Sequence, residues 1–315
     1  MSKFTLALVA AVSAATGAGI SAAVYSARNE IKNKSQSAPV TNTVPTKSSK
    51  TSTQLPVDPA GLFQYGFPGP VADLAKRQAL TSSFDRRLRN PHWVAEHFTP
   101  SSLKNSVADR KASVFREDES IPEKFRGKLK DYARSGYDRG HQVPAADVKW
   151  SQDAMNETFY LSNMCPQVGE GFNRDYWSHF EDFCRRLVQH YPSVRVVTGP
   201  LYLPKKDISD GKWRVSYEVI GNPPNIAVPT HFYKVIFAES GTNNGPVALG
   251  AFVLPNSPIP NSKPITDFEV PLETVERASG LEFATLLPLE KRRRLCSDQN
   301  CSLIVRDFTN KQRSL

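Results

Sequence analysis

The sequence predicts an α+β layer fold, and three observations support that prediction. Runs of β-branched and aromatic residues are bounded by Gly and Pro, which is typical of strands. Two other stretches place apolar residues at helical spacing. Strands and helices alternate irregularly and the sequence has no glycine-rich phosphate loop, which favours segregated layers over a doubly wound parallel sheet.

Three segments are predicted strands. They cover residues 193–203, 227–239 and 247–255, with the sequences SVRVVTGPLYL, AVPTHFYKVIFAE and VALGAFVLP. The third is a continuous apolar run, which indicates a strand that is covered on both faces.

Two segments are predicted helices. Residues 174–191 carry one apolar face, formed by Trp177, Phe180, Cys184, Leu187 and Val188. Residues 271–283 form the second helix, which we expect to stop at Gly280 because glycine favours helix ends.

Composition and charge divide the chain into three parts. The first 50 residues contain six Lys or Arg and a single acid, so they account for five of the nine net positive charges. The remainder is only mildly basic, and a nucleic-acid surface on it would have to be local. We predict a mitochondrial targeting or membrane-anchor segment over 1–28, a disordered linker over 29–57 and one globular domain over 58–315.

Three interpretations of the N-terminal segment stay open at this point. Residues 4–25 contain no charged side chain, a length that would cross a bilayer, but they are rich in Ala, Gly and Ser. The segment is a membrane anchor, a secretory signal or part of a mitochondrial presequence. The basic and almost acid-free surroundings favour the mitochondrial interpretation.

Four cysteines are too few, and too irregularly spaced, for a zinc site. Free buried thiols are favoured over a disulfide framework, although a single local bridge between Cys296 and Cys301 stays open.

The stretch SGYDRGHQVPAAD, residues 135–147, frames His141 with turn-forming residues instead of apolar ones. Gly140 allows a close backbone approach, and Pro144 ends the strand that carries the histidine, so the imidazole would sit where a cleft commonly opens. The alternative is a solvated loop histidine beside an Asp138–Arg139 ion pair.

A second candidate site lies in GEGFNRDYW and the predicted helix after it. Asn173 stands at the mouth of this helix, where an ordinary helix N-cap is the alternative interpretation. Within the helix, Glu181 and Arg185 are four residues apart and share a face. They form either a surface ion pair or a face that is turned toward a metal and a phosphate.

Taken together, DRGHQVPAAD, FYLSNMCPQ and GFNRDYW resemble the DNA/RNA non-specific endonucleases of the ββα-metal class, and within them the mitochondrial endonuclease G branch with its fungal members. The resemblance runs from VDPAGLFQYGFPGP to IVRDF, nearly the whole body. It implies a ββα-metal nuclease fold whose central sheet is rich in antiparallel strands and flanked by helices.

The resemblance also implies roles for the matching residues. His141 is expected to be the general base, and Asn173 the direct protein ligand of a single Mg²⁺, with Mn²⁺ as a substitute. Glu181 is expected to accept hydrogen bonds from metal-bound water, and Arg139 and Arg185 to hold the phosphate. Asn163 is expected to support nucleic-acid binding.

The reaction implied is hydrolysis of phosphodiester bonds in double- and single-stranded DNA and in RNA, leaving 5′-phosphate ends. Arg86, Arg87 and Arg89, in DRRLR, are expected to line the nucleic-acid groove, with a solvated surface as the alternative. The run KRRRL at 291–295 is favoured as a charged helix end over a nuclear-import signal or further positive charge in the nucleic-acid groove.

The resemblance further implies a homodimer in the mitochondrion, in the inner membrane or the intermembrane space, with relocation to the nucleus as an option. Two other functions stay open: a catalytically silent nucleic-acid-binding protein of the same fold, and a secreted nuclease. Cys165 lies between two site motifs where many animal members have Ala, so we expect its oxidation or alkylation to slow the enzyme.

Overall fold

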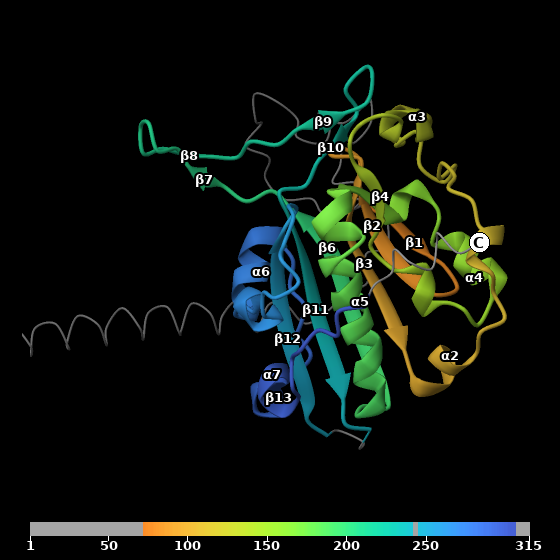
Figure 1. Ribbon diagram of the computed structural model, residues 1–315, viewed down its shortest axis with the longest axis vertical. Coiled ribbons are helices and arrows are strands. Elements are labelled where there is room, and N and C mark those ends of the chain that lie inside the picture. The colour runs from red at the N-terminus through yellow and green to blue at the C-terminus, as the bar shows by residue number, and fades with distance from the viewer. Residues whose placement is uncertain (1–71, 242–244, 307–315) are drawn as a thin grey trace, which may run out of the picture. The chain divides into compact units, whose positions relative to one another are not determined.

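A seven-stranded sheet organises the part of the chain that this computed structural model describes, residues 72–241 and 245–306 (Figure 1). The strand order is β1-β2-β3-β6-β11-β12-β13. Each neighbouring pair is antiparallel except β12 and β13, which are parallel. The predicted α+β fold with an antiparallel-rich central sheet is therefore confirmed.

The elements have the following bounds. The sheet consists of β1 (Asp73–Lys76), β2 (Leu80–Asp85), β3 (Asn90–Phe98), β6 (Ser193–Leu201), β11 (His231–Glu239), β12 (Val247–Pro255) and β13 (Arg292–Arg294). Three short pairs lie outside it: β4 (Asp138–His141) with β5 (Met164–Gln167), β7 (Lys205–Lys206) with β8 (Trp213–Arg214), and β9 (Val219–Ile220) with β10 (Ile226–Ala227). The helices are α2 (Pro100–Lys104), α3 (Leu129–Tyr132), α4 (Gln152–Glu157), α5 (Tyr176–Arg186), α6 (Leu272–Ser279) and α7 (Leu295–Asp298).

Helices α5 and α6 pack against opposite faces of the sheet. Alternate residues of a strand point to opposite faces, and β11 follows this rule. Phe232 and Ile236 belong to the core formed with α5, whereas Tyr233 and Val235 belong to the core formed with α6. Burial on both faces explains why β11 and β12 read as nearly continuous apolar runs.

The predicted segments match the structure closely. The three predicted strands contain β6, β11 and β12, and the two predicted helices contain α5 and α6. Helix α6 ends at Gly280, whose φ of 73° is the left-handed conformation that glycine adopts without strain.

Two features near the C-terminus correct or complete the sequence interpretation. Arg292–Arg294 form the edge strand β13 and not a charged helix end, since the next helix starts at Leu295. Cys296 and Cys301 form a disulfide, so the expectation of free thiols is wrong for this pair. It is correct for Cys165 and Cys184, which are free and buried.

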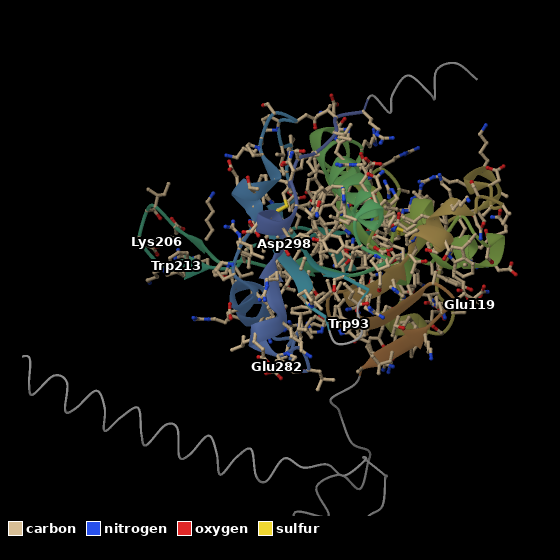
Figure 2. All side chains as sticks on the ribbon, turned by 90° about the horizontal axis from the view of Figure 1, so that it is seen from below. Trp93, Glu119, Lys206, Trp213, Glu282 and Asp298 are labelled. Carbon is tan, nitrogen blue, oxygen red and sulfur yellow. A yellow bond between two sulfur atoms is a disulfide. The ribbon has the colours of Figure 1, made fainter. Side chains whose placement is uncertain are left out.

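The β7–β8 hairpin stands off the rest of the described chain (Figure 1). Figure 2 shows the same arrangement from below, with Lys206 and Trp213 on the projecting hairpin. The hairpin and the stretch that leads from β8 to β9 form an arm over residues 205–219.

The predicted targeting segment, 1–28, and the predicted linker, 29–57, lie outside the described residues, and so do residues 58–71 of the predicted domain. These boundaries stay predictions. Within residues 72–241 and 245–306, no helix is both long and apolar enough to cross a membrane.

Candidate active site

His141 is the last residue of β4, the strand end at which the sequence places it. Strands β4 and β5 pair so that Gly140 lies opposite Cys165 and His141 opposite Met164. A Cβ atom at Gly140 would overlap the side chain of Gln167, so only glycine allows this approach.

A pocket of about 420 Å³ opens beside His141. It is lined by Arg110, Phe115, Asp138, Arg139, His141, Pro144, Ala145, Asn173, Arg174, Ser178 and Glu181. These residues come from β4, from α5 and from the loops beside them (Figure 1). Four of the predicted site residues therefore meet in one pocket: Arg139, His141, Asn173 and Glu181.

The His141 ring is held among aromatic side chains. Its centroid lies 4.8 Å from that of Phe159, edge to face, and 5.6 Å from that of Phe115. Nε2 is buried and makes no hydrogen bond within the described residues. Burial, helped by the nearby Arg110 and Arg139, lowers the pKa of His141 to about 3, so the imidazole is neutral at neutral pH.

Asn173 is oriented by a carboxylate. Its Nδ2 donates a 2.8 Å hydrogen bond to Asp138 Oδ2. An ionised carboxylate only accepts hydrogen bonds, so this contact identifies the amide nitrogen and turns Oδ1 away from Asp138. Oδ1 has no hydrogen-bond donor among the residues that the structure describes.

Asp138 is itself fixed by Arg174, which donates two hydrogen bonds to it, at 2.8 and 2.5 Å. Burial alone would raise the pKa of Asp138, but the bonds from Arg174 and Asn173 outweigh it and lower that pKa. Two alternatives drawn from the sequence, the Asp138–Arg139 ion pair and Asn173 as an ordinary helix N-cap, are therefore wrong. Asp138 pairs with Arg174 instead of Arg139, and the residue that precedes α5 is Asp175, not Asn173.

Glu181 faces the pocket from α5, and burial raises its pKa to about 7, although Lys234 and Arg185 oppose the rise. The surface ion pair between Glu181 and Arg185, one of the two alternatives drawn from the sequence, is not formed within the described chain. Arg185 instead donates a 2.7 Å hydrogen bond to the buried carboxylate of Asp147. Arg185 therefore lies behind the pocket and not on its lining.

Two other arginines supply positive charge at the pocket. The exposed Arg139 has its guanidinium 4.2 Å from the Phe115 ring centroid. Arg110 lies 5.5 Å from the Phe159 ring centroid. The sequence interpretation missed Arg110, for which no local motif gives a signal. It also gave no site role to Asp138 and Arg174, although they are direct neighbours of residues that it selected.

Asn163 lies behind the histidine strand and is 2% exposed. Its Oδ1 accepts from the backbone N–H of Val143, and its Nδ2 donates to the carbonyls of Val143 and Thr158. These bonds fix the backbone that follows His141. This position suits a supporting role and not direct contact with nucleic acid.

Arg86, Arg87 and Arg89 lie in the turn between β2 and β3 and do not line the pocket. Arg86 pairs with Asp73, and Arg89 donates to backbone carbonyls that include that of Lys124. Only Arg87 of the three is exposed. The predicted groove contact stays a prediction.

The pocket offers few anionic ligands for a metal. Among the described residues there is no cluster of three or more His, Cys, Asp or Glu suited to a metal ion. A single amide oxygen is the expected protein ligand for a hard cation that keeps most of its water. The free Oδ1 of Asn173, fixed in direction by Asp138, fits that requirement.

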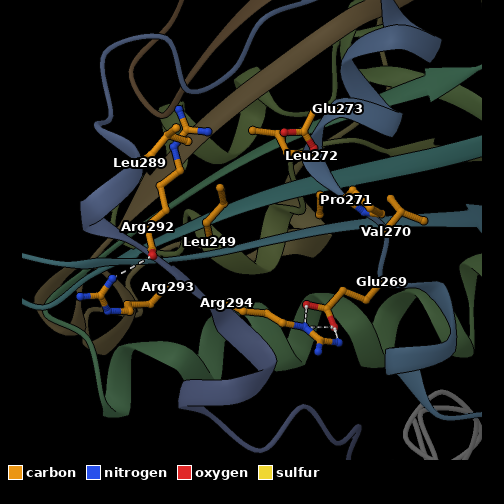
Figure 3. A pocket seen from close by; sticks show the side chains of 11 residues that line it. Leu249, Glu269, Val270, Pro271, Leu272, Glu273, Leu289, Arg292, Arg293 and Arg294 are labelled. Carbon is orange, nitrogen blue, oxygen red and sulfur yellow. Dashed lines mark hydrogen bonds and ion pairs between the residues drawn. The ribbon is translucent and has the colours of Figure 1, made fainter. Parts of the chain in front are cut away.

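A second pocket, of about 480 Å³, lies beside α6 and β13 (Figure 3). Its arginines are occupied within the chain: Arg294 forms a bidentate pair with Glu269, and Arg292 donates to the carbonyls of Ala284 and Leu287. None of the predicted site residues lines it.

Cys165 is fully buried in β5, and burial raises the pKa of its thiol well above the ordinary value. The thiolate is the reactive form of cysteine, so burial disfavours modification of Cys165 in the folded protein, and the expected effect of modification on the enzyme stays a prediction.

Comparison with known proteins settles the family. Residues 58–290 match the sequence model of the DNA/RNA non-specific endonucleases. The chain belongs to this family. It is accordingly a nuclease, a hydrolase of phosphodiester bonds.

Similar proteins are named as mitochondrial nucleases or endonucleases. The chain is 63% identical to the mitochondrial nuclease of Saccharomyces cerevisiae over 257 residues, which is 81% of this chain and 78% of that protein. It is 43% identical to the mitochondrial endonuclease G of Caenorhabditis elegans over 84% of this chain and 85% of the relative. Among solved structures, the EndoG/EndoGI complex contains a chain that is 46% identical, with a TM-score of 0.68, and the match covers 78% of this chain and all of that one.

Proposed function

We propose that the protein is a metal-dependent, sugar-non-specific endonuclease that cleaves DNA and RNA and leaves 5′-phosphate ends. The observation that supports this most strongly is the meeting of a neutral histidine, His141, with an amide oxygen, Asn173 Oδ1, in one cationic pocket.

His141 is the proposed general base. A neutral imidazole accepts a proton from water as the water oxygen attacks phosphorus. The bond from phosphorus to the 3′ oxygen then breaks, so the phosphate stays on the 5′ end of the downstream fragment.

Asn173 is the proposed ligand of one Mg²⁺, with Mn²⁺ as a substitute. When bound, the cation supplies positive charge that stabilises the developing negative charge on the phosphate and the leaving oxygen. Asp138 fixes the direction of the Asn173 amide. Glu181 lines the same pocket and would accept hydrogen bonds from water bound to the cation.

Arg139 and Arg110 are the proposed phosphate contacts, because both guanidinium groups line the pocket. Arg185 is bonded to Asp147 behind the pocket, so we propose that it fixes the α5 face that carries Glu181. Contacts to phosphate position a substrate without reading its bases, which accounts for low sequence specificity.

The relatives' names support a mitochondrial location for this chain as well. We propose the inner membrane or the intermembrane space as its compartment, with residues 1–28 as the address or anchor and relocation to the nucleus as an option. We also propose that the protein acts as a homodimer.

The test is cleavage of supercoiled plasmid and of single-stranded RNA over a range of Mg²⁺ concentrations and in EDTA, with analysis of the product ends. We expect both substrates to be cut only with metal, with 5′-phosphate ends, and Asn173→Ala to require far more Mg²⁺. Retarded migration without cleavage would favour the catalytically silent binding protein. Metal-independent cleavage, or an unchanged Mg²⁺ requirement in the variant, would overturn the metal site.

A further inference from the structure

Three polar side chains interrupt the apolar face of the sheet that packs against α5. Alternate residues of a strand share a face, so Glu96 of β3 lies on the same face as Phe98, and Lys234 of β11 on the same face as Phe232. Thr198 of β6 pairs with Lys234 across the strands and completes the row. Glu96 is 7% exposed and Lys234 1%. Ionisable groups are costly to bury, so their presence beneath the active-site helix points to a function.

Lys234 is fixed between the sheet and α5. Its Nζ donates a 2.8 Å hydrogen bond to Thr198 Oγ1 and lies 4.8 Å from the ring centroid of Trp177, which belongs to α5. Its positive charge acts on both Glu96 and Glu181.

Glu96 meets a second carboxyl group, that of Asp147. The two are hydrogen-bonded to each other, and Oε2 of Glu96 has no partner within the described residues. An ionised carboxylate only accepts hydrogen bonds, so one of the two carboxyl groups carries a proton. Asp147 also accepts the 2.7 Å hydrogen bond from Arg185, a contact that favours an ionised acceptor. Glu96 is therefore the donor.

The surroundings of Glu96 agree with this assignment. Burial raises its pKa well above the ordinary value, and the charge of Asp147 raises it further, while Lys234 opposes the rise. The other titratable groups that face Glu96 are Glu181 and Cys184, both on α5.

Charge balance in this buried layer supports the same assignment. With Glu96 neutral, the carboxylates of Asp147 and Glu181 face two cations, Lys234 and Arg185. An ionised Glu96 would leave one negative charge in excess, and an unbalanced buried charge is strongly destabilising.

We propose that Glu96 is a positioning residue for the active site: its protonated carboxyl donates a hydrogen bond to Asp147 and thereby fixes two walls of the pocket. Asp147 ends the 3₁₀ turn Ala145–Asp147, whose first residue lines the pocket. Through Arg185 it also holds α5 one helical turn from Glu181. This inference rests on the proposed function, in which Glu181 acts on water bound to the cation. It adds a residue of the sheet that does not itself line the pocket.

The test compares two substitutions of Glu96 that fill similar space. The amide of Gln donates a hydrogen bond as the protonated acid does, whereas Met donates none. Single-turnover cleavage of supercoiled plasmid is measured at pH 7 and at one subsaturating Mg²⁺ concentration, so that weaker metal binding and slower chemistry both appear. Glu96→Gln should cut at close to the wild-type rate. Glu96→Met should be slower by about 10- to 100-fold, the usual cost of losing an orienting partner.

A second measurement follows the proton on Glu96 and does not depend on cleavage. The urea midpoints of the wild type and of Glu96→Gln are compared by circular dichroism between pH 4 and pH 8, in EDTA. Above about pH 4.5 the unfolded state loses this proton while the folded state keeps it, so the wild type should lose stability relative to Glu96→Gln as the pH rises. This comparison holds even if Glu96→Met fails to fold.

Three results would overturn the proposal. Glu96→Met that cuts at the wild-type rate would reject the positioning role. Glu96→Gln that is as slow as Glu96→Met, or a difference in urea midpoint that is the same at every pH, would reject the neutral donor. A wild type that does not cleave DNA with Mg²⁺ would instead refute the proposed function, and the unfolding comparison would still accept or reject the hydrogen bond from Glu96 to Asp147.

Discussion

Replacing Glu181 by Gln should change how the stability of the protein depends on pH. Burial raises the pKa of this carboxyl from 4.5 to about 7, so the folded state binds its proton more tightly than the unfolded state does. Below pH 4.5 the carboxyl is protonated in both states and has no effect. Between pH 4.5 and about 7 the unfolded state loses this proton while the folded state keeps it, so stability falls progressively, and above about pH 7 both states are ionised and the loss is complete.

The size of the effect follows from the two pKa values. A rise from 4.5 to about 7 corresponds to about 3 kcal/mol in the free energy of unfolding. Gln resembles the neutral acid at every pH. Glu181→Gln should therefore match the wild type near pH 4 and exceed its stability by about 3 kcal/mol near pH 8.

The assay is urea unfolding followed by circular dichroism between pH 4 and pH 8, in EDTA so that no bound cation favours the ionised form. Glu119→Gln is the matched control, because Glu119 is exposed and its substitution should not change the pH dependence. If the difference between Glu181→Gln and the wild type is the same at every pH, the carboxyl is not buried as described and the reasoning fails.

Three further predictions concern residues around the site. Asp138→Asn should raise the Mg²⁺ concentration needed for half-maximal cleavage by about 10- to 100-fold, because Asn173 loses its orienting carboxylate. The control is Asp153→Asn, which changes an exposed carboxylate and should have no effect. An equal effect of both substitutions would contradict the role of Asp138. Asn163→Leu should lower the free energy of unfolding by about 3 kcal/mol in urea titrations, because it leaves buried backbone groups of the loop after His141 unpaired. Unchanged stability together with weaker DNA binding would instead support a direct contact between Asn163 and nucleic acid. Cys165 should react with iodoacetamide only after unfolding, as mass spectrometry of the labelled protein would show; rapid labelling of the folded enzyme would contradict its burial.

Local sequence pattern was enough to predict three of the seven strands of the sheet, β6, β11 and β12, and the helices α5 and α6, but it gave no prediction for β1, β2 and β3. Strand β12 is recognised by its continuous apolar run and helix α5 by the helical spacing of its apolar residues, because both elements are buried along much of their length. The edge strand β13 is not recognised in this way, since three consecutive arginines carry no strand pattern and the strand exists only because β12 pairs with it.

The residues of the candidate site were predicted from local motifs, but their hydrogen-bond partners were not. The motifs located His141, Asn173 and Glu181, but local spacing suggested the wrong partners for two neighbouring side chains. Arg185 bonds to Asp147, which lies 38 residues away, and Asp138 pairs with Arg174, which lies 36 residues away. Partners of this kind are set by how β4 and α5 pack together, and this packing cannot be predicted from a short stretch of sequence.

The most direct test of the account is single-turnover cleavage of supercoiled plasmid at saturating Mg²⁺ by the full chain, its His141→Ala variant and, as control, His190→Ala, which removes an exposed histidine. General base catalysis contributes about 10²–10⁴-fold, so His141→Ala should be slower than wild type by a factor in that range, while His190→Ala should cut at the wild-type rate. A His141→Ala variant that cuts as fast as the wild type would contradict the assignment of the base.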